Sequence, residues 1–264
     1  MLSRRFLLAA GLGVGFGSGP ALAAEEVREE PWNLDGLAGT LALPRGGGRG
    51  LSGGRSLGVL IIAGSGPTDR DGNGPGLATD LYRKIALALA AAGHVVLRYD
   101  KRGIAGSRAL ARREEDLAFG LLQADARRAL LSLKGRPDVH GVVPLGHSEG
   151  GLIAIRLALA EPVAGLVLMA VPGRTLAAVL AEQIAASGAS PELVTEAGAI
   201  LAALARGERV AEVSPALAPL FRPSVQPYLM SELTIDPAAD LARVRVPTLI
   251  LTGGRDLQVS DEDA

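Results

Sequence analysis

The sequence predicts an α/β fold in which helices flank a mostly parallel β-sheet. Short apolar runs alternate with amphipathic segments of ten or more residues, which is the pattern of strands joined by crossover helices. Most of these runs are continuously apolar, as strands covered on both faces require. The chain has 264 residues, of which 48% are hydrophobic, so it is long enough to bury a core of this kind.

The elements are expected in strict alternation along the chain. A polar, glycine-bearing lead-in covers residues 25–55, in which Gly39–Pro44 alternates weakly and predicts an edge strand, and Gly46–Gly50 predicts a loop or hairpin tip. The later predicted strands are 57–63, 94–99, 139–145, 163–170 and 246–252. The predicted helices between them are 80–92, 114–134 and 150–160.

The strands stop between residues 171 and 240, where the chain becomes rich in alanine. Three helical segments are expected there, at 175–186, 191–205 and about 213–229. We interpret residues 171–240 as a helical cap or lid inserted over the sheet. Residues 24–170 and 241–264 then form the first and the final, incomplete part of one core.

Composition excludes several classes of protein. The formal net charge of −1 gives no electrostatic footprint for nucleic acid. The chain has no cysteine, which excludes a disulfide scaffold, thiolate metal sites and a cysteine nucleophile. Its three histidines leave little room for a histidine-rich metal site. We therefore expect no metal, no cofactor and no nucleic-acid partner, but a small-molecule substrate; the sequence leaves the oligomeric state open.

The first 23 residues have the pattern of an export signal. Arg4 and Arg5 form a positive region, residues 6–16 are apolar, and Ala21–Ala23 is a small-x-small cleavage site. Ser3–Leu8 resembles a twin-arginine signal, with a general secretory signal as the alternative. The sequence thus predicts a periplasmic or secreted protein with no membrane insertion after processing.

The sharpest motif is Gly146-His-Ser-Glu-Gly150, which matches the Gly-x-Ser-x-Gly nucleophile elbow. An apolar strand is predicted to end at its first glycine and a helix to begin at its last. This strand–turn–helix context is the one that the motif requires, since the flanking positions of so tight a turn have no room for side chains. Ser148 is the predicted nucleophile.

Catalysis by such a serine needs an oxyanion hole. One donor is expected to be the backbone N–H of Glu149, the residue after the nucleophile. The second is expected from the loop after strand 57–63, as the N–H of Ser65 or of Gly66. A phosphate-binding loop is the alternative, but neither glycine-rich phosphate motif follows that strand.

Three segments carry a family resemblance, and they occur in the family's order: Gly64–Asn73, Leu97–Ser107 and the elbow. Over residues 39–256 the chain resembles exported bacterial α/β-hydrolases of the serine-aminopeptidase-like and carboxylesterase groups. The resemblance implies an α/β-hydrolase fold with a helical lid. It also implies a catalytic acid after a late strand and a histidine near the C-terminus.

Asp256 is the acid that the resemblance implies, because it lies just past the strand at 246–252. Its role would be to accept the Nδ1 proton of the histidine and so to hold its tautomer. The alternative is a turn aspartate that follows two glycines. Asp236 and Asp240 compete for the role, but they precede the strand and resemble helix-start residues.

The family pattern breaks at the histidine. His94, His140 and His147 all precede Asp256, whereas the family order is Ser, then acid, then His. Truncation, degeneration to an inactive relative and a different base are three explanations. We favour truncation, since Ser260–Ala264 resembles the start of a helix, with a serine cap and acids in its first turn. The expected activity of these 264 residues is very low.

The sequence therefore predicts a serine hydrolase that cleaves carboxylic esters through an acyl-enzyme on Ser148, without metal or organic cofactor. An aminopeptidase or acyl transferase on the same site is one alternative, and a non-catalytic binding protein on the same scaffold is another. The charged loop residues Asp69–Asp71 are expected to brace their loop, with substrate binding as the alternative. Arg98–Arg102 is likewise interpreted as loop structure.

Overall fold

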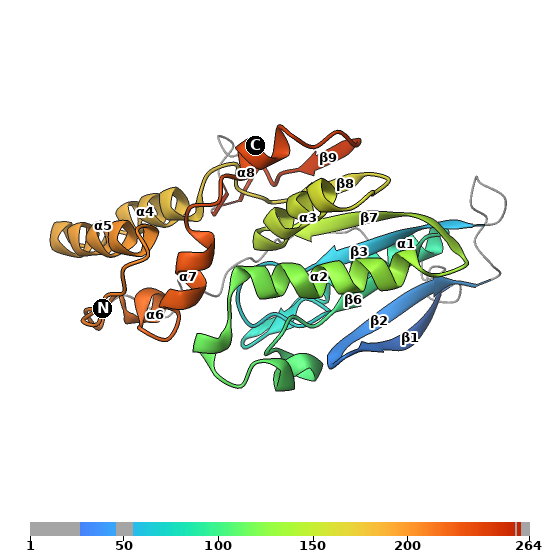
Figure 1. Ribbon diagram of the computed structural model, residues 1–264, viewed down its shortest axis with the longest axis horizontal. Helices are drawn as coiled ribbons and strands as arrows, with labels where there is room; N and C mark the ends of the chain where they lie inside the picture. The colour runs from blue at the N-terminus through green and yellow to red at the C-terminus, as the bar shows by residue number, and fades with distance from the viewer. Residues whose placement is uncertain (1–26, 46–54, 257, 260–264) are drawn as a thin grey trace.

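The computed structural model describes residues 27–45, 55–256 and 258–259 (Figure 1). Among these residues, one seven-stranded sheet has the order β1-β2-β6-β3-β7-β8-β9. Its strands are β1 (Val27–Leu34), β2 (Leu37–Pro44), β3 (Ser56–Ile62), β6 (Val95–Tyr99), β7 (Val139–His147), β8 (Leu166–Met169) and β9 (Thr248–Leu251). Within this sheet only the β1–β2 and β2–β6 pairs are antiparallel; β4 (Asn73–Gly74) and β5 (Leu77–Ala78) form a separate antiparallel pair. The predicted mostly parallel α/β sheet is confirmed.

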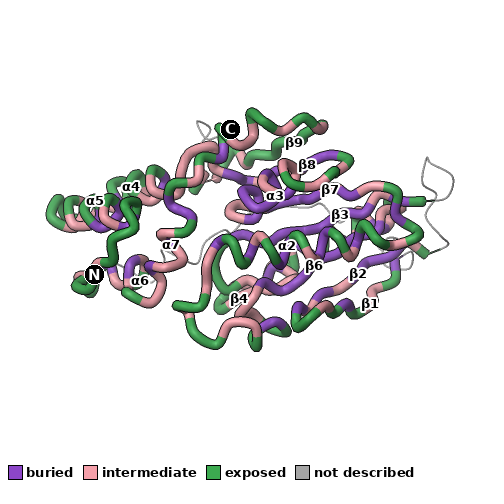
Figure 2. Tube along the Cα trace, in the orientation of Figure 1, coloured by how far each residue is buried: buried purple, intermediate pink, exposed green. Residues whose placement is uncertain are grey.

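Helices cover both faces of this sheet. They are α1 (Leu81–Ala91) on one face, with α2 (Phe119–Lys134) and α3 (Glu149–Ala160) on the other. The central strand β3 shows why its run is continuously apolar: Leu60 and Ile62 pack toward α2 and α3, while Val59 and Ile61 pack toward α1. Figure 2 shows the resulting buried band along the strands.

Five helices lie between β8 and β9: α4 (Leu176–Ala186), α5 (Pro191–Ala205), α6 (Ala218–Phe221), α7 (Gln226–Glu232) and α8 (Pro237–Leu241). Four of them, α4 to α7, gather beyond one end of the strands (Figure 1) and share an apolar cluster of their own. Thr175 and Ser190 cap α4 and α5, because their hydroxyl groups accept the backbone N–H groups of Ala178 and Leu193.

Two predicted helices differ from the structure. The segment at 213–229 splits into α6 and α7, because each helix begins with a proline in its first turn and Pro223 lies between them. The helix predicted over 114–134 begins only at Phe119. Glu114–Asp116 forms a separate 3₁₀ turn, η3, held where the Glu114 carboxylate binds Arg222 and Ser224.

The strand expected at an edge, Gly39–Pro44, is instead an inner strand, and this prediction was wrong. β1 covers it, and the two strands form a hairpin through Asp35 and Gly36, which have φ values of 47° and 88°. Asp-Gly is a strong hairpin signal because both residues tolerate positive φ. β1 itself was missing from the expected elements, although this dipeptide marks its end.

Three predictions fall outside the described residues: the signal at residues 1–23, the loop at 46–50 and the helix start at 260–264. Among the helices that the structure describes, none has both the length and the apolar character needed to cross a bilayer.

Candidate active site

Ser148 occupies the turn between β7 and α3. Its backbone has φ 50° and ψ −124°, a conformation that a residue with a side chain adopts only under strain. Two hydrogen bonds hold this conformation. The Ser148 N–H donates to the Met169 carbonyl at 3.0 Å, and the Ser148 carbonyl accepts from the Gly151 N–H at 2.8 Å. The predicted strand–turn–helix setting is therefore present.

The glycines of the elbow are required by close backbone approach. A Cβ added at Gly146 would lie 2.2 Å from the Gly150 carbonyl oxygen, and one at Gly150 would lie 2.3 Å from the Ile62 carbonyl oxygen. A Cβ at Gly151 would lie 2.0 Å from the Val171 side chain. The crowding predicted for this turn is confirmed, and it extends one residue beyond the motif.

The loop after β3 lies against the elbow. A Cβ added at Gly64 would be 3.1 Å from the Ser148 Cβ and 3.0 Å from the His147 Nδ1 atom. Ser65, the next residue, is exposed. The structure thus brings the peptide proposed as the second oxyanion donor beside the nucleophile, and Glu149, the proposed first donor, begins α3.

Gly64 itself is held at both of its polar backbone groups. Its N–H donates to the Tyr82 hydroxyl at 3.1 Å, and its carbonyl oxygen accepts a short hydrogen bond from the Lys101 ammonium. Neither Tyr82 nor Lys101 was a predicted site residue. Lys101 follows β6. The loops after three neighbouring strands, β6, β3 and β7, therefore meet at this point.

His147 faces Tyr82. Its Nδ1 atom lies 2.8 Å from the Tyr82 hydroxyl oxygen, and the two rings meet edge to face at 5.8 Å between centroids. Burial lowers the pKa of His147 below its usual value; the charge of Asp256 opposes this shift, and Lys101 adds to it. These contacts give His147 a structural role in the elbow, as the sequence predicts.

Asp256 follows β9 in a turn of its own. Its Oδ1 atom accepts the backbone N–H groups of Gln258 and Val259, at 2.8 and 3.2 Å. This is the turn geometry of the alternative interpretation. The carboxylate nevertheless acts electrostatically on His147 in the elbow. The hydrogen bonds fit the turn interpretation, and the catalytic role of Asp256 stays a prediction.

The two competing aspartates have structural partners. Asp236 caps α8 by accepting the Ala239 N–H at 3.0 Å, and Asp240 pairs with Arg156 and Arg243 at 3.0 and 3.1 Å. Their interpretation as helix-start residues is confirmed.

The loop ion pairs are also present. Arg98 binds Asp71 at 2.7 Å and Arg70 binds Asp100 at 2.6 Å, and Arg98 and Asp100 are buried. The predicted bracing of this loop is confirmed. The remaining histidine of β7, His140, is exposed at the start of the strand, where its Nδ1 atom lies 3.2 Å from the Arg55 carbonyl oxygen.

A group of four side chains, here called the polar cluster, gathers around Glu149 of the elbow: buried Lys101, Glu149 and Glu232, and half-buried Tyr228. The Tyr228 hydroxyl donates to Glu149 Oε1 at 2.5 Å, and the Lys101 ammonium lies 3.6 Å from Glu149 Oε2. Burial, reinforced by the charge of Glu149, raises the pKa of Glu232 well above its usual value. The pKa of Tyr228 is raised for the same reasons.

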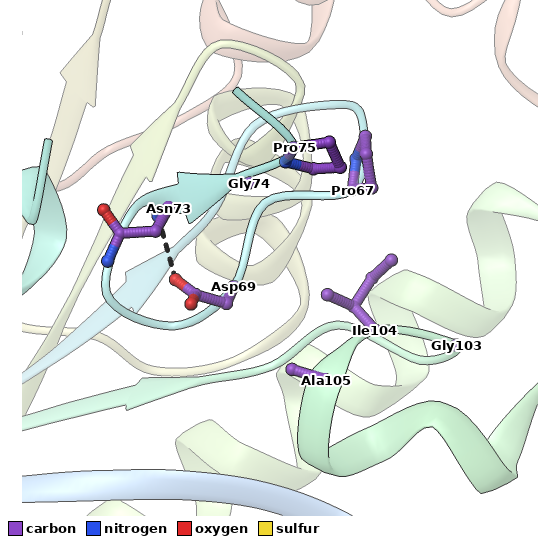
Figure 3. Close-up of a pocket in the computed structure, with 8 residues that line it drawn as sticks. All are labelled: Pro67, Asp69, Asn73, Gly74, Pro75, Gly103, Ile104 and Ala105. Atoms are coloured by element: carbon purple, nitrogen blue, oxygen red, sulfur yellow. Dashed lines mark hydrogen bonds between the residues drawn. The ribbon is translucent and has the colours of Figure 1, made fainter. Parts of the chain in front are cut away.

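A pocket of about 480 Å³ opens on the loops that follow β3 and β6 (Figure 3). It is lined by Pro67, Asp69, Asn73, Gly74, Pro75, Gly103, Ile104 and Ala105. Asp69 Oδ1 accepts the Asn73 N–H at 2.9 Å and so closes one wall. Most of the lining is small or apolar, and the pocket belongs to the same loops that reach Ser148.

Comparison with known proteins places this site in a family. The family model described as serine aminopeptidase, S33, matches residues 73–264. Esterase EstD of Thermotoga maritima is 32% identical over 245 residues, which are 90% of this chain and 54% of EstD. The chain thus spans about half the length of this curated relative.

Solved structures show the same fold. The α/β-hydrolase GrgF from Penicillium sp. sh18 superposes with a TM-score of 0.54 at 20% identity, covering 90% of this chain and 83% of GrgF. VinJ superposes with a TM-score of 0.55 at 18% identity, covering 89% of this chain and 84% of VinJ. The chain has the α/β-hydrolase fold and belongs to the serine aminopeptidase S33 family of hydrolases.

Proposed function

We propose that this chain acts on carboxylic esters through an acyl-enzyme formed on Ser148. The observation that carries the proposal is the strained elbow conformation of Ser148, with the Gly64 loop packed directly against it. Strain of this kind persists where the surrounding structure enforces it, and it is concentrated at functional sites. The relative EstD, which is named an esterase, supports ester chemistry over other acyl chemistry.

The proposed reaction has two stages. The Ser148 hydroxyl oxygen attacks the ester carbonyl carbon while its proton passes to a general base, and the carbonyl oxygen becomes an oxyanion. The N–H groups of Glu149 and Ser65 bind that oxyanion. The bond to the alcohol then breaks, the alcohol takes the proton, and water hydrolyses the acyl-serine to return Ser148 and release the acid.

Asp256 is proposed to orient the general base by accepting the Nδ1 proton of a histidine. In the 264 residues no histidine follows Asp256, and His147 is already engaged with Tyr82. Removing one member of such a triad costs several orders of magnitude in rate while the oxyanion hole leaves some catalysis. We therefore propose that these residues alone turn esters over slowly.

The pocket beside Ile104 is proposed to hold the part of the substrate that extends from the carbonyl. Its mostly small and apolar lining suits an alkyl chain, with Asp69 and Asn73 as the polar groups. Ile104→Trp fills this space. It should weaken binding of long-chain esters while short-chain esters bind as before, and equal effects on both would argue against the assignment.

The experiment that tests the function is chemical rescue of the base. Hydrolysis of p-nitrophenyl esters is measured with increasing imidazole, in the wild type and in Ser148→Ala. Added imidazole is expected to raise the rate of the wild type above that of the variant, because it supplies the base that Ser148 needs. The variant corrects for direct hydrolysis by imidazole.

Three outcomes distinguish the candidates. Equal rates in both proteins at every imidazole concentration would contradict a catalytic Ser148. Brisk turnover without imidazole that Ser148→Ala abolishes would contradict the proposed slow rate. The family name gives a second candidate, aminopeptidase activity, which a rescue seen with aminoacyl p-nitroanilides and not with esters would favour.

A further inference from the structure

Lys101 makes two contacts that the proposed reaction does not use directly. Its ammonium donates to the Gly64 carbonyl oxygen and lies 3.6 Å from the Glu149 carboxylate. The side chains of Lys101 and Glu149 are each only 7% exposed. Burying an ammonium group costs several kcal/mol, and the attraction of a single carboxylate offsets this cost only in part. A buried ion pair is therefore weak evidence for a stabilising role.

The contact with Gly64 fixes the direction of one N–H group. The peptide unit between Gly64 and Ser65 is planar and trans, so its carbonyl oxygen and the Ser65 N–H point in opposite directions. Because Lys101 holds the carbonyl on one side, the Ser65 N–H is aimed to the other. Rotation of this peptide would break the Lys101 contact, while the Tyr82 hydroxyl holds the N–H of the preceding peptide unit, between Ala63 and Gly64.

The ion pair between Lys101 and Glu149 connects Lys101 to the residue that carries the other proposed oxyanion donor. Glu149 is the first residue of α3, and its backbone N–H is the other donor of the proposed oxyanion hole. Its carboxylate accepts a hydrogen bond from the Tyr228 hydroxyl at Oε1, and the Lys101 ammonium lies 3.6 Å from Oε2 as an ion pair without a hydrogen bond. Lys101 thus bridges the peptide that carries one donor and the residue that carries the other.

We propose that Lys101 is a positioning residue of the oxyanion hole, which sets the Ser65 N–H against the Glu149 N–H. This inference rests on the proposed role of Ser148 and of the two donors. An oxyanion hole acts by preorganisation, so donors that are free to turn away lose much of their effect on the rate and little of their effect on ground-state binding. Loss of Lys101 should therefore slow the chemical step and leave substrate affinity nearly unchanged.

The test uses an alkyl fluorophosphonate, which phosphonylates an active serine: the serine oxygen bonds to phosphorus, fluoride leaves, and the hydroxyl proton is lost. The rate constant of labelling at saturation, kinact, reports the chemical step, and Ki reports reversible binding. Removing one oxyanion donor outright typically costs about 10²–10³ in rate. For Lys101→Met, which misorients a donor without deleting it, we expect kinact to fall by about 10-fold to 100-fold with Ki within about twofold.

Lys84 provides the matched control. Its ammonium also donates to a backbone carbonyl oxygen, that of Thr79 at 2.7 Å, but the residue is exposed. Lys84→Met should label at the wild-type rate. Lys101→Arg keeps the cation and its donors, so it should recover part of the lost rate.

Thermal unfolding of each variant is followed by circular dichroism to establish that the variant folds. Should Lys101→Met fail to fold, Lys101→Gln, which keeps an N–H donor without the charge, replaces it with the same expected loss in kinact. A folded Lys101→Met protein, or the Lys101→Gln protein that replaces it, with wild-type kinact would overturn the inference, and so would a loss confined to Ki. A wild type that does not label at Ser148 would instead overturn the proposed function, and the inference with it.

Discussion

The elbow and the polar cluster behind it adjoin each other but are built in different ways. The elbow is a short continuous segment, Gly146–Gly151, in which an added Cβ would collide with backbone atoms at Gly146 and Gly150 and with the Val171 side chain at Gly151. The polar cluster joins Lys101, Glu149 and two residues of α7, from three separate parts of the chain. The nucleophile is thus placed by local backbone sterics, whereas the groups around it are placed by long-range polar contacts.

This difference explains what the sequence reveals. Steric requirements of a tight turn leave glycines at fixed spacing, so the elbow and the start of α3 are predicted within one residue. A buried polar contact between residues far apart in the chain produces no periodic pattern in the sequence. Tyr228 and Glu232 lie four residues apart on a short helix, a spacing equally common among core residues, so the cluster was not predicted.

The same contrast applies to the fold. Continuous apolar runs predicted the parallel strands, because a strand that is covered on both faces needs apolar side chains at successive positions. The hairpin partner β1 was missed, since its sequence, Val27–Leu34, is largely polar and half-exposed. Asp35-Gly36 was its one clear signal. The late start of α2 depends on the pairing of Glu114 with Arg222, more than a hundred residues away, which no local pattern contains.

The largest expected effect comes from breaking the elbow itself. Gly150→Ala would place a Cβ 2.3 Å from the Ile62 carbonyl oxygen, which is backbone and cannot move aside. We expect a loss of at least about 2 kcal/mol in the free energy of unfolding and no labelling of Ser148. Denaturant unfolding measures the first and fluorophosphonate labelling the second.

Gly198→Ala is the matched control, because Gly198 lies inside α5 with nothing within 4 Å of its added Cβ. Alanine there should be neutral or stabilising by up to about 1 kcal/mol. Similar losses in both variants would show that the elbow glycine has no special steric role.

Breaking the polar cluster at Tyr228 should have a smaller effect. Tyr228→Phe removes the hydroxyl that donates to Glu149 Oε1 and leaves a buried carboxylate with one partner fewer. The expected loss of stability is about 1–3 kcal/mol, with slower labelling of Ser148 at unchanged Ki. If stability falls while kinact stays at the wild-type value, the cluster supports the fold and not the oxyanion hole.

The smallest effect on stability is expected at Glu232, and its size depends on pH. Glu232 is buried near Glu149, Tyr228 and Lys101, and its raised pKa means that the folded state keeps a proton that the unfolded state loses. Folding is therefore increasingly disfavoured as the pH rises above the ordinary carboxyl value of 4.5, until the raised pKa is passed.

Glu232→Gln removes this titration. The melting temperature of the variant should rise relative to that of the wild type as the pH increases from about 5 to about 8. The expected shift is about 2–4 °C for each kcal/mol by which the free energies of unfolding of the two proteins come to differ. Below the ordinary carboxyl pKa the relative advantage should disappear. A difference that is constant with pH would show that the carboxyl group is not held in its neutral form.

Ser148 is proposed as the nucleophile, and peptide mapping after fluorophosphonate labelling is the most direct test of that role. Trypsin releases residues 135–156 as one peptide, in which Ser148 is the single hydroxyl-bearing residue, so a mass increase identifies the site without ambiguity. We expect the phosphonyl adduct on this peptide and its loss in Ser148→Ala. An adduct found only on another peptide, or the same labelling in Ser148→Ala, would contradict it.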